Sequence, residues 1–235
     1  MQRLILPLLL TLMPVLTLAK TPIFGKAEVE VEHMYEYVCR HNPNFQREVA
    51  EAFYTVGERY GIRGDIALCQ AIIETGWFRF DNGTAVNPKH HNYCGLGVKS
   101  RGDKGCKFDS VEEGVTAMIQ HLYAYACSEQ LPEGEAMVDP RFTFVKRGCA
   151  PTWEGLAGRW AMNEHYGKNI LKIYTGLADH AKARGKSKEK PGADGVRVVN
   201  LIEVEIPSEY YLTGEGGSGL QDSPASDSSI NDLFK

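Results

Sequence analysis

Apolar residues recur at steps of three and four along most of the chain between residues 28 and 183. This spacing is typical of helices that bury one face and expose the other. The sequence therefore predicts one mainly helical domain over residues 28–183. One such stripe comprises Phe45, Val49, Phe53 and Val56, and another comprises Val111, Val115, Met118, Ile119 and Leu122.

Local signals predict where two of these helices begin and end. Asp65 stands in the N-cap position before the apolar run "IALCQAII", and this helix is expected to end at Thr75 with Gly76 as its stop. Ser110 and Glu113 form a capping-box pattern, which predicts that another helix begins there.

The segments "NPKHHNYCGLGV" (87–98) and "KGCKF" (104–108) lack helical periodicity and carry glycines and charges. They predict a loop or a short β-hairpin. Two further helices are expected, over "TWEGLAGRWA" (152–161) and "YGKNILKIYTGLADHAKA" (166–183). The expected fold class is therefore mainly α, of the α+β kind, with any β content in the short β-hairpin or loop.

The two ends of the chain differ in composition from this domain. Residues 1–19 combine Arg3, a long apolar stretch and small residues at the end, which is typical of a cleaved signal peptide. A retained anchor is the alternative, but Pro7 and Pro14 interrupt a stretch that is shorter than the roughly 20 residues a span requires. Residues 184–235 begin with a basic run and become rich in Gly, Ser and Asp, so a linker and a disordered tail are expected. The protein is expected to be secreted or in the cell envelope, with no membrane span after signal cleavage.

Composition and charge narrow the function further. The chain has 235 residues, of which 43 % are hydrophobic, and a formal net charge of −4. These values are ordinary for one globular domain and give no sign of the clustered basic surface that binds nucleic acid. We expect a monomer with no nucleic-acid partner.

Six cysteines in an exported chain permit disulfides. Cys94 and Cys106 flank a short Gly-rich loop, so a bridge between them is expected. Cys69 shares helical spacing with Ile66 and Ile73, so we expect it to be a small buried hydrophobic residue.

The stretch "AIIETGWFRF" sets Glu74 inside an apolar run, on one helical stripe with Gln70 and Trp77. Burial and the negative end of the helix dipole both favour the protonated carboxyl group. An acid with a raised pKa, close to an aromatic ring that offers a face to a sugar, is what cleavage of a glycosidic bond requires. Glu74 is therefore predicted to be a general acid.

Five segments occur in order between about Gly61 and His180: "ALCQAIIETGWFRF", "NYCGLG", "FDSVEEGVTAMIQHLYAYA", "VDPRF" and "RWAMNEHYGKNI". They resemble successive motifs of the glucosaminidase domain of glycoside hydrolase family 73. The resemblance implies a lysozyme-like helical fold, no cofactor, and peptidoglycan glycan strands as the partner. It also implies an autolysin with endo-β-N-acetylglucosaminidase activity, which cuts after N-acetylglucosamine, and Glu74 of the "E-[ST]-G-W" motif as its acid.

The resemblance assigns roles to further residues. Tyr166 in "EHYGKN" would hold the N-acetyl group or stabilise developing positive charge, unless it only caps the core. Asn92 and Tyr93 lie where the loop should border the sugar cleft, although they could merely shape a turn. The expected substrate-binding residues are Trp77, Asn92, Tyr93, His121, Asp139 and Arg141, of which the last three have a structural role as the alternative.

One departure from the family pattern affects the mechanism. Many members have a longer hairpin that carries a second catalytic acid, whereas the only acids in the corresponding gap here are Asp103 and Asp109. Either a second carboxylate or the N-acetyl oxygen of the substrate would complete the reaction. Two other functions stay open: a lytic transglycosylase, and a non-catalytic cell-wall-binding protein that keeps the fold.

No metal site is expected from the sequence. "KHHNYC" brings two histidines and a cysteine together, but His90 and His91 are adjacent. No second cluster at zinc-like spacing completes a set of ligands.

Overall fold

A computed structural model describes residues 19–81, 85–100 and 102–188 of the chain. This part is mainly helical, as the lysozyme-like expectation requires, and it contains isolated β-bridges but no strand. Of the two alternatives expected for residues 87–108, a loop or a short β-hairpin, the described residues form a loop. In chain order the elements are α1 (Val31–Cys39), α2 (Arg47–Tyr60), α3 (Gly64–Thr75), η1 (Pro88–His90), α4 (Val111–Ala126), η2 (Phe142–Phe144), η3 (Trp153–Leu156) and α5 (Tyr166–Lys188).

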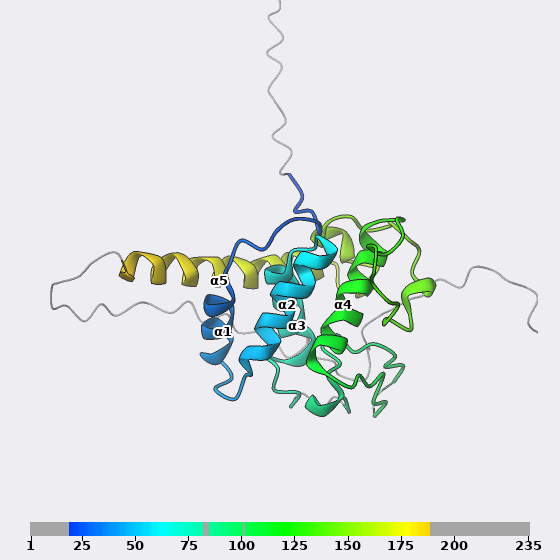
Figure 1. Ribbon diagram of the computed structural model, residues 1–235, viewed down its shortest axis with the longest axis horizontal. Coiled ribbons are helices and arrows are strands. Elements are labelled where there is room, and N and C mark those ends of the chain that lie inside the picture. Colours follow the sequence, from blue (N-terminus) through cyan, green and yellow to red (C-terminus); the bar gives the residue numbers. More distant parts are fainter. Residues whose placement is uncertain (1–18, 82–84, 101, 189–235) are drawn as a thin grey trace, which may run out of the picture.

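Helix α3 lies at the centre of the domain, and all of its residues are buried. It packs between α2 and α5, while α4 covers the other side of α2 (Figure 1). Cys69 is fully buried on α3, as expected. A central helix that is apolar on all sides makes any polar group on it costly unless that group has partners.

The end of α3 was predicted correctly and its start was not. The helix ends at Thr75, and Gly76 follows in the left-handed region at φ 60°, which a residue without a side chain adopts at little cost. The N-cap is Arg63 rather than Asp65. Asp65 is fully buried in the first turn, where its carboxylate accepts hydrogen bonds from the Arg63 guanidinium at 2.9 Å and from the Glu28 amide at 2.8 Å. Asp65 thus ties the N-terminal segment to the core, a role that local spacing does not predict.

Helix α4 begins as its sequence predicted. The Ser110 hydroxyl accepts the amide N–H of Glu113 at 3.1 Å. The Glu113 carboxylate accepts the amide of Asp109 at 2.6 Å, so the reciprocal bond of a capping box is displaced by one residue.

The loop after η1 is closed by an amide side chain and not by a disulfide. Cys94 and Cys106 are free thiols, which corrects the expected bridge. Asn92 holds the loop instead: its Nδ2 donates to the carbonyls of Leu96 at 2.9 Å and Cys106 at 3.1 Å, and its Oδ1 accepts the Leu96 amide at 2.9 Å. The Cys106 amide adds a bond to the Leu96 carbonyl at 2.7 Å.

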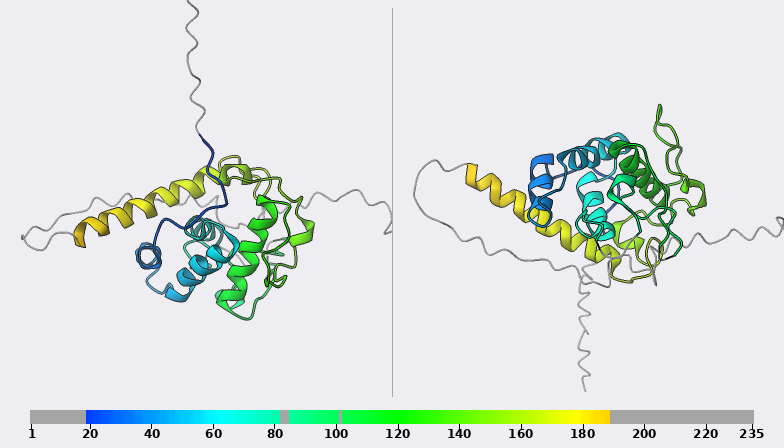
Figure 2. Two further views of the ribbon diagram at one scale, coloured as in Figure 1. Left: turned by 45° about the horizontal axis from the view of Figure 1, so that its top comes forward. Right: turned by 90° about the horizontal axis from the view of Figure 1, so that it is seen from below.

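Helix α5 runs along the domain and continues past the expected boundary at Ala183 to Lys188 (Figure 2). Its first half packs on α3 and η3 and it also contacts α1. Nearly all of the expected signal peptide, and the tail from residue 189 onward, lie outside the described residues. Within the described residues, no helix combines the length and apolar character that a membrane crossing needs.

Candidate active site

Glu74 occupies the last turn of α3 and is only 5 % exposed. Its Oε1 accepts two hydrogen bonds, one from the Tyr166 hydroxyl and one from Nε1 of Trp160 at 3.1 Å. Burial raises the pKa of Glu74 from 4.5 to about 7, and the two hydrogen bonds act in the opposite direction. The carboxyl group therefore holds its proton up to near-neutral pH.

The two oxygens of Glu74 have different surroundings. Both donors point at Oε1, whereas Oε2 accepts no hydrogen bond from the residues that the structure describes. A neutral carboxyl group with two donors on one oxygen carries its proton on the other oxygen. The proton of the Glu74 carboxyl group is therefore expected on Oε2.

A second helix residue completes this network. Gln70, one turn before Glu74, donates from Nε2 to the Tyr166 hydroxyl at 2.9 Å. That bond leaves the Tyr166 hydroxyl hydrogen for Glu74, so Gln70, Tyr166 and Glu74 form one chain of hydrogen bonds. Burial and the nearby Glu74 raise the pKa of Tyr166, which keeps the phenol a donor.

Tyr166 reaches Glu74 because α5 begins very close to η3. A Cβ atom at Gly167 would lie 2.2 Å from the carbonyl oxygen of Trp153, a distance that no side chain tolerates. Gly167 therefore permits the close approach that places Tyr166, the first residue of α5, beside α3. Trp160 comes from the segment between η3 and α5 and is fully buried.

The structure brings Gln70 and Trp160 into the site, and neither was predicted as a site residue. Gln70 precedes Glu74 by four residues, and that spacing was the available signal. Trp160 belongs to the same segment as Tyr166, but its periodicity fitted core packing equally well.

The turn after Glu74 keeps an unusual backbone. Trp77, Phe78 and Phe80 have φ of 60°, 57° and 55°, in the left-handed region that favours glycine. Hydrogen bonds hold this turn: Asn42 Nδ2 donates to the Trp77 carbonyl at 3.0 Å, and the Phe78 amide donates to the Thr75 hydroxyl at 2.9 Å. Strain of this kind persists only where the surroundings impose it.

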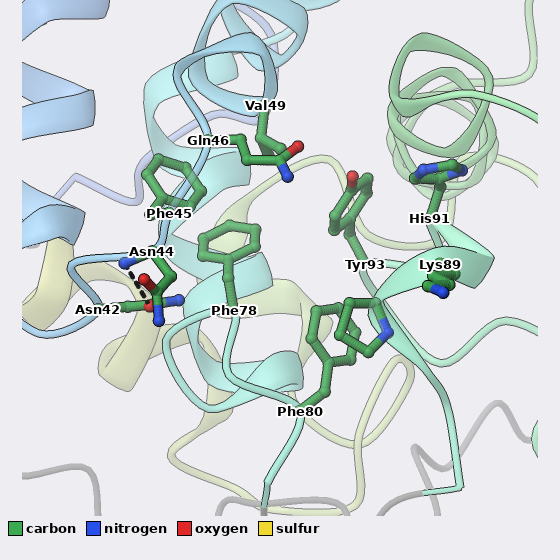
Figure 3. A pocket seen from close by; sticks show the side chains of 11 residues that line it. Asn42, Asn44, Phe45, Gln46, Val49, Phe78, Phe80, Lys89, His91 and Tyr93 are labelled. Carbon is green, nitrogen blue, oxygen red and sulfur yellow. Dashed lines mark hydrogen bonds between the residues drawn. The ribbon is translucent and has the colours of Figure 1, made fainter.

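Two aromatic residues of the turn have different positions. The Trp77 ring is 3 % exposed and stacks on His41 with centroids 3.6 Å apart, so it packs between α1 and α3. Phe80 lies instead at a pocket of about 190 Å³ that is bordered by the start of α2 and by Tyr93 (Figure 3). Figure 3 shows the Tyr93 and Phe80 rings on one side of this pocket and Phe78 and Phe45 on another. Asn44, Gln46 and Lys89 add polar groups to it.

Tyr93 and Asn92 are adjacent but have different surroundings. Tyr93 lies against Phe53, Phe78 and Phe80, and burial raises its pKa, so its hydroxyl is a neutral hydrogen-bonding group. Asn92 is 1 % exposed, and its side chain makes three hydrogen bonds to the backbone of the loop. These contacts match the alternative in which Asn92 shapes the turn.

His121 and Asp139 form a buried pair behind the acid. Nδ1 of His121 lies 2.7 Å from Oδ2 of Asp139, and the imidazole meets the Trp160 ring edge-on with centroids 5.1 Å apart. Asp139 Oδ1 accepts the amide of Arg141 at 2.8 Å. The pair therefore supports Trp160, which donates to Glu74. The guanidinium of Arg141 lies over the ring of Phe144.

The remaining acids near the loop lie outside this network. Asp103 accepts the amides of Lys99 and Gly105, and these bonds lower its pKa, so it closes a turn as a carboxylate. Asp109 is exposed at the start of α4.

Histidines of the "KHHNYC" segment do not gather as ligands. His90 lies by the amide of Asn87 at 3.3 Å, and His91 lies by the carbonyl of Phe108 at 3.0 Å. In the described ranges, the group with spacing suited to a metal is His33, Glu36 and His180, on α1 and α5.

A mainly helical domain whose central helix ends in a buried, proton-holding glutamic acid has the form of a lysozyme-like glycosidase. Residues 50–179 match the model of the glucosaminidase family, described as mannosyl-glycoprotein endo-beta-N-acetylglucosaminidase. The chain belongs to this family, whose domain indicates a peptidoglycan-related glycosidase.

An uncharacterized protein of Borreliella burgdorferi is 35 % identical to this chain over 165 residues. The aligned region covers 68 % of this chain and 79 % of the length of that protein. No solved structure matches the chain.

Proposed function

We propose that this protein is an endo-β-N-acetylglucosaminidase that cleaves the glycan strand of peptidoglycan after N-acetylglucosamine, with Glu74 as the general acid. The observation that carries the proposal is the asymmetric hydrogen bonding of Glu74, with both donors on Oε1 and the proton left to Oε2. A pKa of about 7 is suited to a group that must be protonated before the reaction and give up its proton during it.

In the bond-breaking step, Oε2 of Glu74 transfers its proton to the glycosidic oxygen while the bond from that oxygen to the anomeric carbon breaks. The leaving sugar departs as an alcohol and the anomeric carbon becomes electron-poor. Tyr166 and Trp160 then donate to a carboxylate that has just become charged, which stabilises it. Tyr166 is therefore a residue that positions and stabilises Glu74.

The electron-poor carbon needs a nucleophile. Asp103 is occupied by two backbone amides and Asp139 by His121, so neither carboxylate is poised for attack. This favours the N-acetyl oxygen of the substrate as the attacking group, followed by water.

The pocket beside Tyr93 provides a place for a neighbouring sugar. It combines aromatic rings from the strained turn with amide side chains of Asn44 and Gln46, a mixture that suits sugar faces and hydroxyls. Phe78 follows Glu74 by four residues, so their Cα atoms are at most about 14 Å apart. A glycan strand cut at Glu74 is long enough to occupy both places.

Digestion of peptidoglycan tests the proposal. Purified mature protein should release fragments with a reducing N-acetylglucosamine end, and mass spectrometry distinguishes these from the 1,6-anhydromuramyl ends of a lytic transglycosylase. Glu74→Gln should give no fragments. Glu164→Gln is the matched control, because Glu164 has a side chain that is 86 % exposed and lies outside the network.

The absence of a clearing zone in a zymogram from wild-type protein that is folded would favour the wall-binding alternative. A secreted or envelope location follows from this substrate, and a monomeric state is a separate part of the proposal. Fractionation of cells and light scattering of the purified protein check these two points.

A further inference from the structure

Three potential metal ligands meet where α1 packs against α5. His33 and Glu36 lie one turn apart on α1, and His180 lies on α5. Figure 1 shows α1 packed against α5. Their ligand atoms all lie within 4.8 Å of one another. The side chain of His180 is 7 % exposed and that of His33 is 17 % exposed, so the group lies largely inside the helix contact.

The distances suit a tetrahedral metal ion. Oε2 of Glu36 is 3.3 Å from Nε2 of His180 and 3.7 Å from Nδ1 of His33. Ligand atoms about 2.1 Å from a zinc ion at tetrahedral angles are roughly 3.4 Å apart. Two imidazoles and one carboxylate also form a ligand set that zinc uses in proteins, with water in the fourth position.

One atom of the group lacks a partner. Nδ1 of His33 is buried and has no hydrogen bond within the described ranges of the chain. Its nearest polar atom in the group, Oε2 of Glu36, is beyond hydrogen-bond distance at 3.7 Å. A buried ring nitrogen without a partner costs free energy, and a metal ion placed between the three side chains would remove that cost.

Two arginines compete with such an ion. Nε of Arg184 lies 3.2 Å from Oε2 of Glu36, and Nη1 of Arg40 lies 3.3 Å from Nδ1 of His180. A guanidinium can only donate, so its contact requires Nδ1 of His180 to be the acceptor and Nε2 to carry the hydrogen. Metal binding at Nε2 needs the other tautomer, and Arg40 must then turn away. The side chain of Arg184 is 56 % exposed, so it is free to move into water.

We propose that His33, Glu36 and His180 bind a zinc ion that joins α1 to α5. The site is independent of the glycosidase proposal, because none of its residues contacts Glu74, Tyr166 or Trp160. It closes a connection between the N-terminal helix and the last helix of the domain, two elements that are distant in sequence.

Calorimetric titration of the metal-free, full-length mature protein with zinc chloride tests this proposal. We expect one saturable site with Kd at or below about 10 μM and a higher Tm when zinc is present. His33→Ala should weaken binding at least about tenfold and remove the zinc-dependent rise in Tm. His33 is the first choice because it is only partly buried, and circular dichroism verifies that the variant is folded.

Two further variants separate this site from others. His165→Ala is the matched control, because His165 also lies beside a glutamate but is 56 % exposed, and its binding should equal that of wild type. Arg40→Ala should strengthen zinc binding, since it removes the competing donor to His180. Cobalt in place of zinc should give the intense visible bands of a tetrahedral site.

The proposal is overturned if the folded wild type binds no zinc in this range. It is equally overturned if binding persists unchanged in His33→Ala, since the ion would then be held elsewhere, for example by the free thiols of the chain.

Discussion

The hydroxyl of Tyr166 donates its hydrogen to Oε1 of Glu74, although the two residues are 92 positions apart in the sequence. One is the first residue of α5 and the other lies in the last turn of α3. The surroundings of Glu74 are therefore assembled from two helices, and the pKa of its carboxyl group depends on hydrogen bonds as well as on burial.

Glu74→Gln should abolish glycan cleavage and leave the fold intact. The amide oxygen still accepts hydrogen bonds from Tyr166 and Trp160, but no transferable proton remains, so the loss should be at least about a hundredfold. Reducing-end release from soluble wall fragments measures it. Activity within tenfold of wild type in a folded variant would remove Glu74 from its role.

The same variant should be more stable than wild type at alkaline pH. The pKa of Glu74 is about 7 in the folded protein, above the usual 4.5 of an unfolded chain. The folded state therefore holds the proton more tightly, so stability is retained below pH 4.5 and falls as pH rises to about 7. The difference corresponds to about 3 kcal/mol at pH 8. Urea unfolding at pH 4.5 and pH 8 should show the gain for Glu74→Gln only at pH 8.

Tyr166→Phe should move the alkaline limb of the activity profile to higher pH. The hydroxyl of Tyr166 lowers the pKa of Glu74, so its removal lets burial act with less opposition. The rate should fall as well, because the carboxylate formed in the reaction loses a donor. A pH profile of kcat/KM checks this, with Tyr54→Phe, on the surface of α2, as control. A limb that stays in place would mean that Tyr166 serves only in packing.

Asn92→Ala should cost more stability than Cys106→Ser. Asn92 makes three hydrogen bonds that close the loop, two of them buried, and its removal leaves backbone groups unsatisfied, at about 1–3 kcal/mol. Cys106 is a free thiol in the structure. Thermal unfolding compares the two, and non-reducing peptide mapping of protein from its own oxidising compartment reports the thiols directly. An equal loss in both variants, with a bridged peptide, would restore the disulfide.

Tyr93→Ala should raise KM for long glycan fragments more than it lowers kcat. The Tyr93 ring borders the pocket, whereas Glu74 and its donors lie elsewhere. Phe24→Ala is the control, because Phe24 is a partly exposed ring that does not line the pocket. The ratio of KM in the variant to KM in wild type should be larger for long fragments than for short ones. Equal ratios would exclude a role for Tyr93 in binding a neighbouring sugar.

Truncation after Pro191 should leave hydrolysis of soluble fragments unchanged. The tail has a composition that buries no core, and no residue of the hydrogen-bond network lies in it. Activity assays on the shortened protein measure this. Loss of folding would place part of the tail inside the domain.

Local patterns predicted the end of α3 and the start of α4 correctly, because each signal lies within a few residues of what it specifies. The helix expected over residues 152–161 is instead only the short 3-10 helix η3. Gly76 stops α3 and Ser110 starts α4, as their sequences indicated. Asp65 was wrongly predicted as an N-cap, because its carboxylate accepts hydrogen bonds from Arg63 and from Glu28, and Glu28 is distant along the chain.

Glu74 was singled out from its apolar setting and Tyr166 from the family resemblance, whereas Trp160 was not predicted to contact Glu74. The role of Glu74 as the acid stays a prediction. The contact of Trp160 with Glu74 depends on how the segment before α5 packs on α3. The contact of His180 with Arg40 likewise depends on how α5 packs on α1. Periodicity carries no information on such contacts. The cluster of His33, Glu36 and His180 was not predicted for the same reason, because no short spacing motif joins α1 to α5.

Helix α5 gives the molecule a mechanical property. Tyr166 and His180 are fourteen steps apart on one helix, so about 21 Å of rigid rod connects them. Because α5 contacts α1 near the middle of α5, it has little freedom to tilt at its first residue, Tyr166. The contact of α5 with α1 therefore also restricts where the Tyr166 hydroxyl lies. A change at that distant contact is expected to weaken the hydrogen bond from Tyr166 to Glu74 without altering either residue.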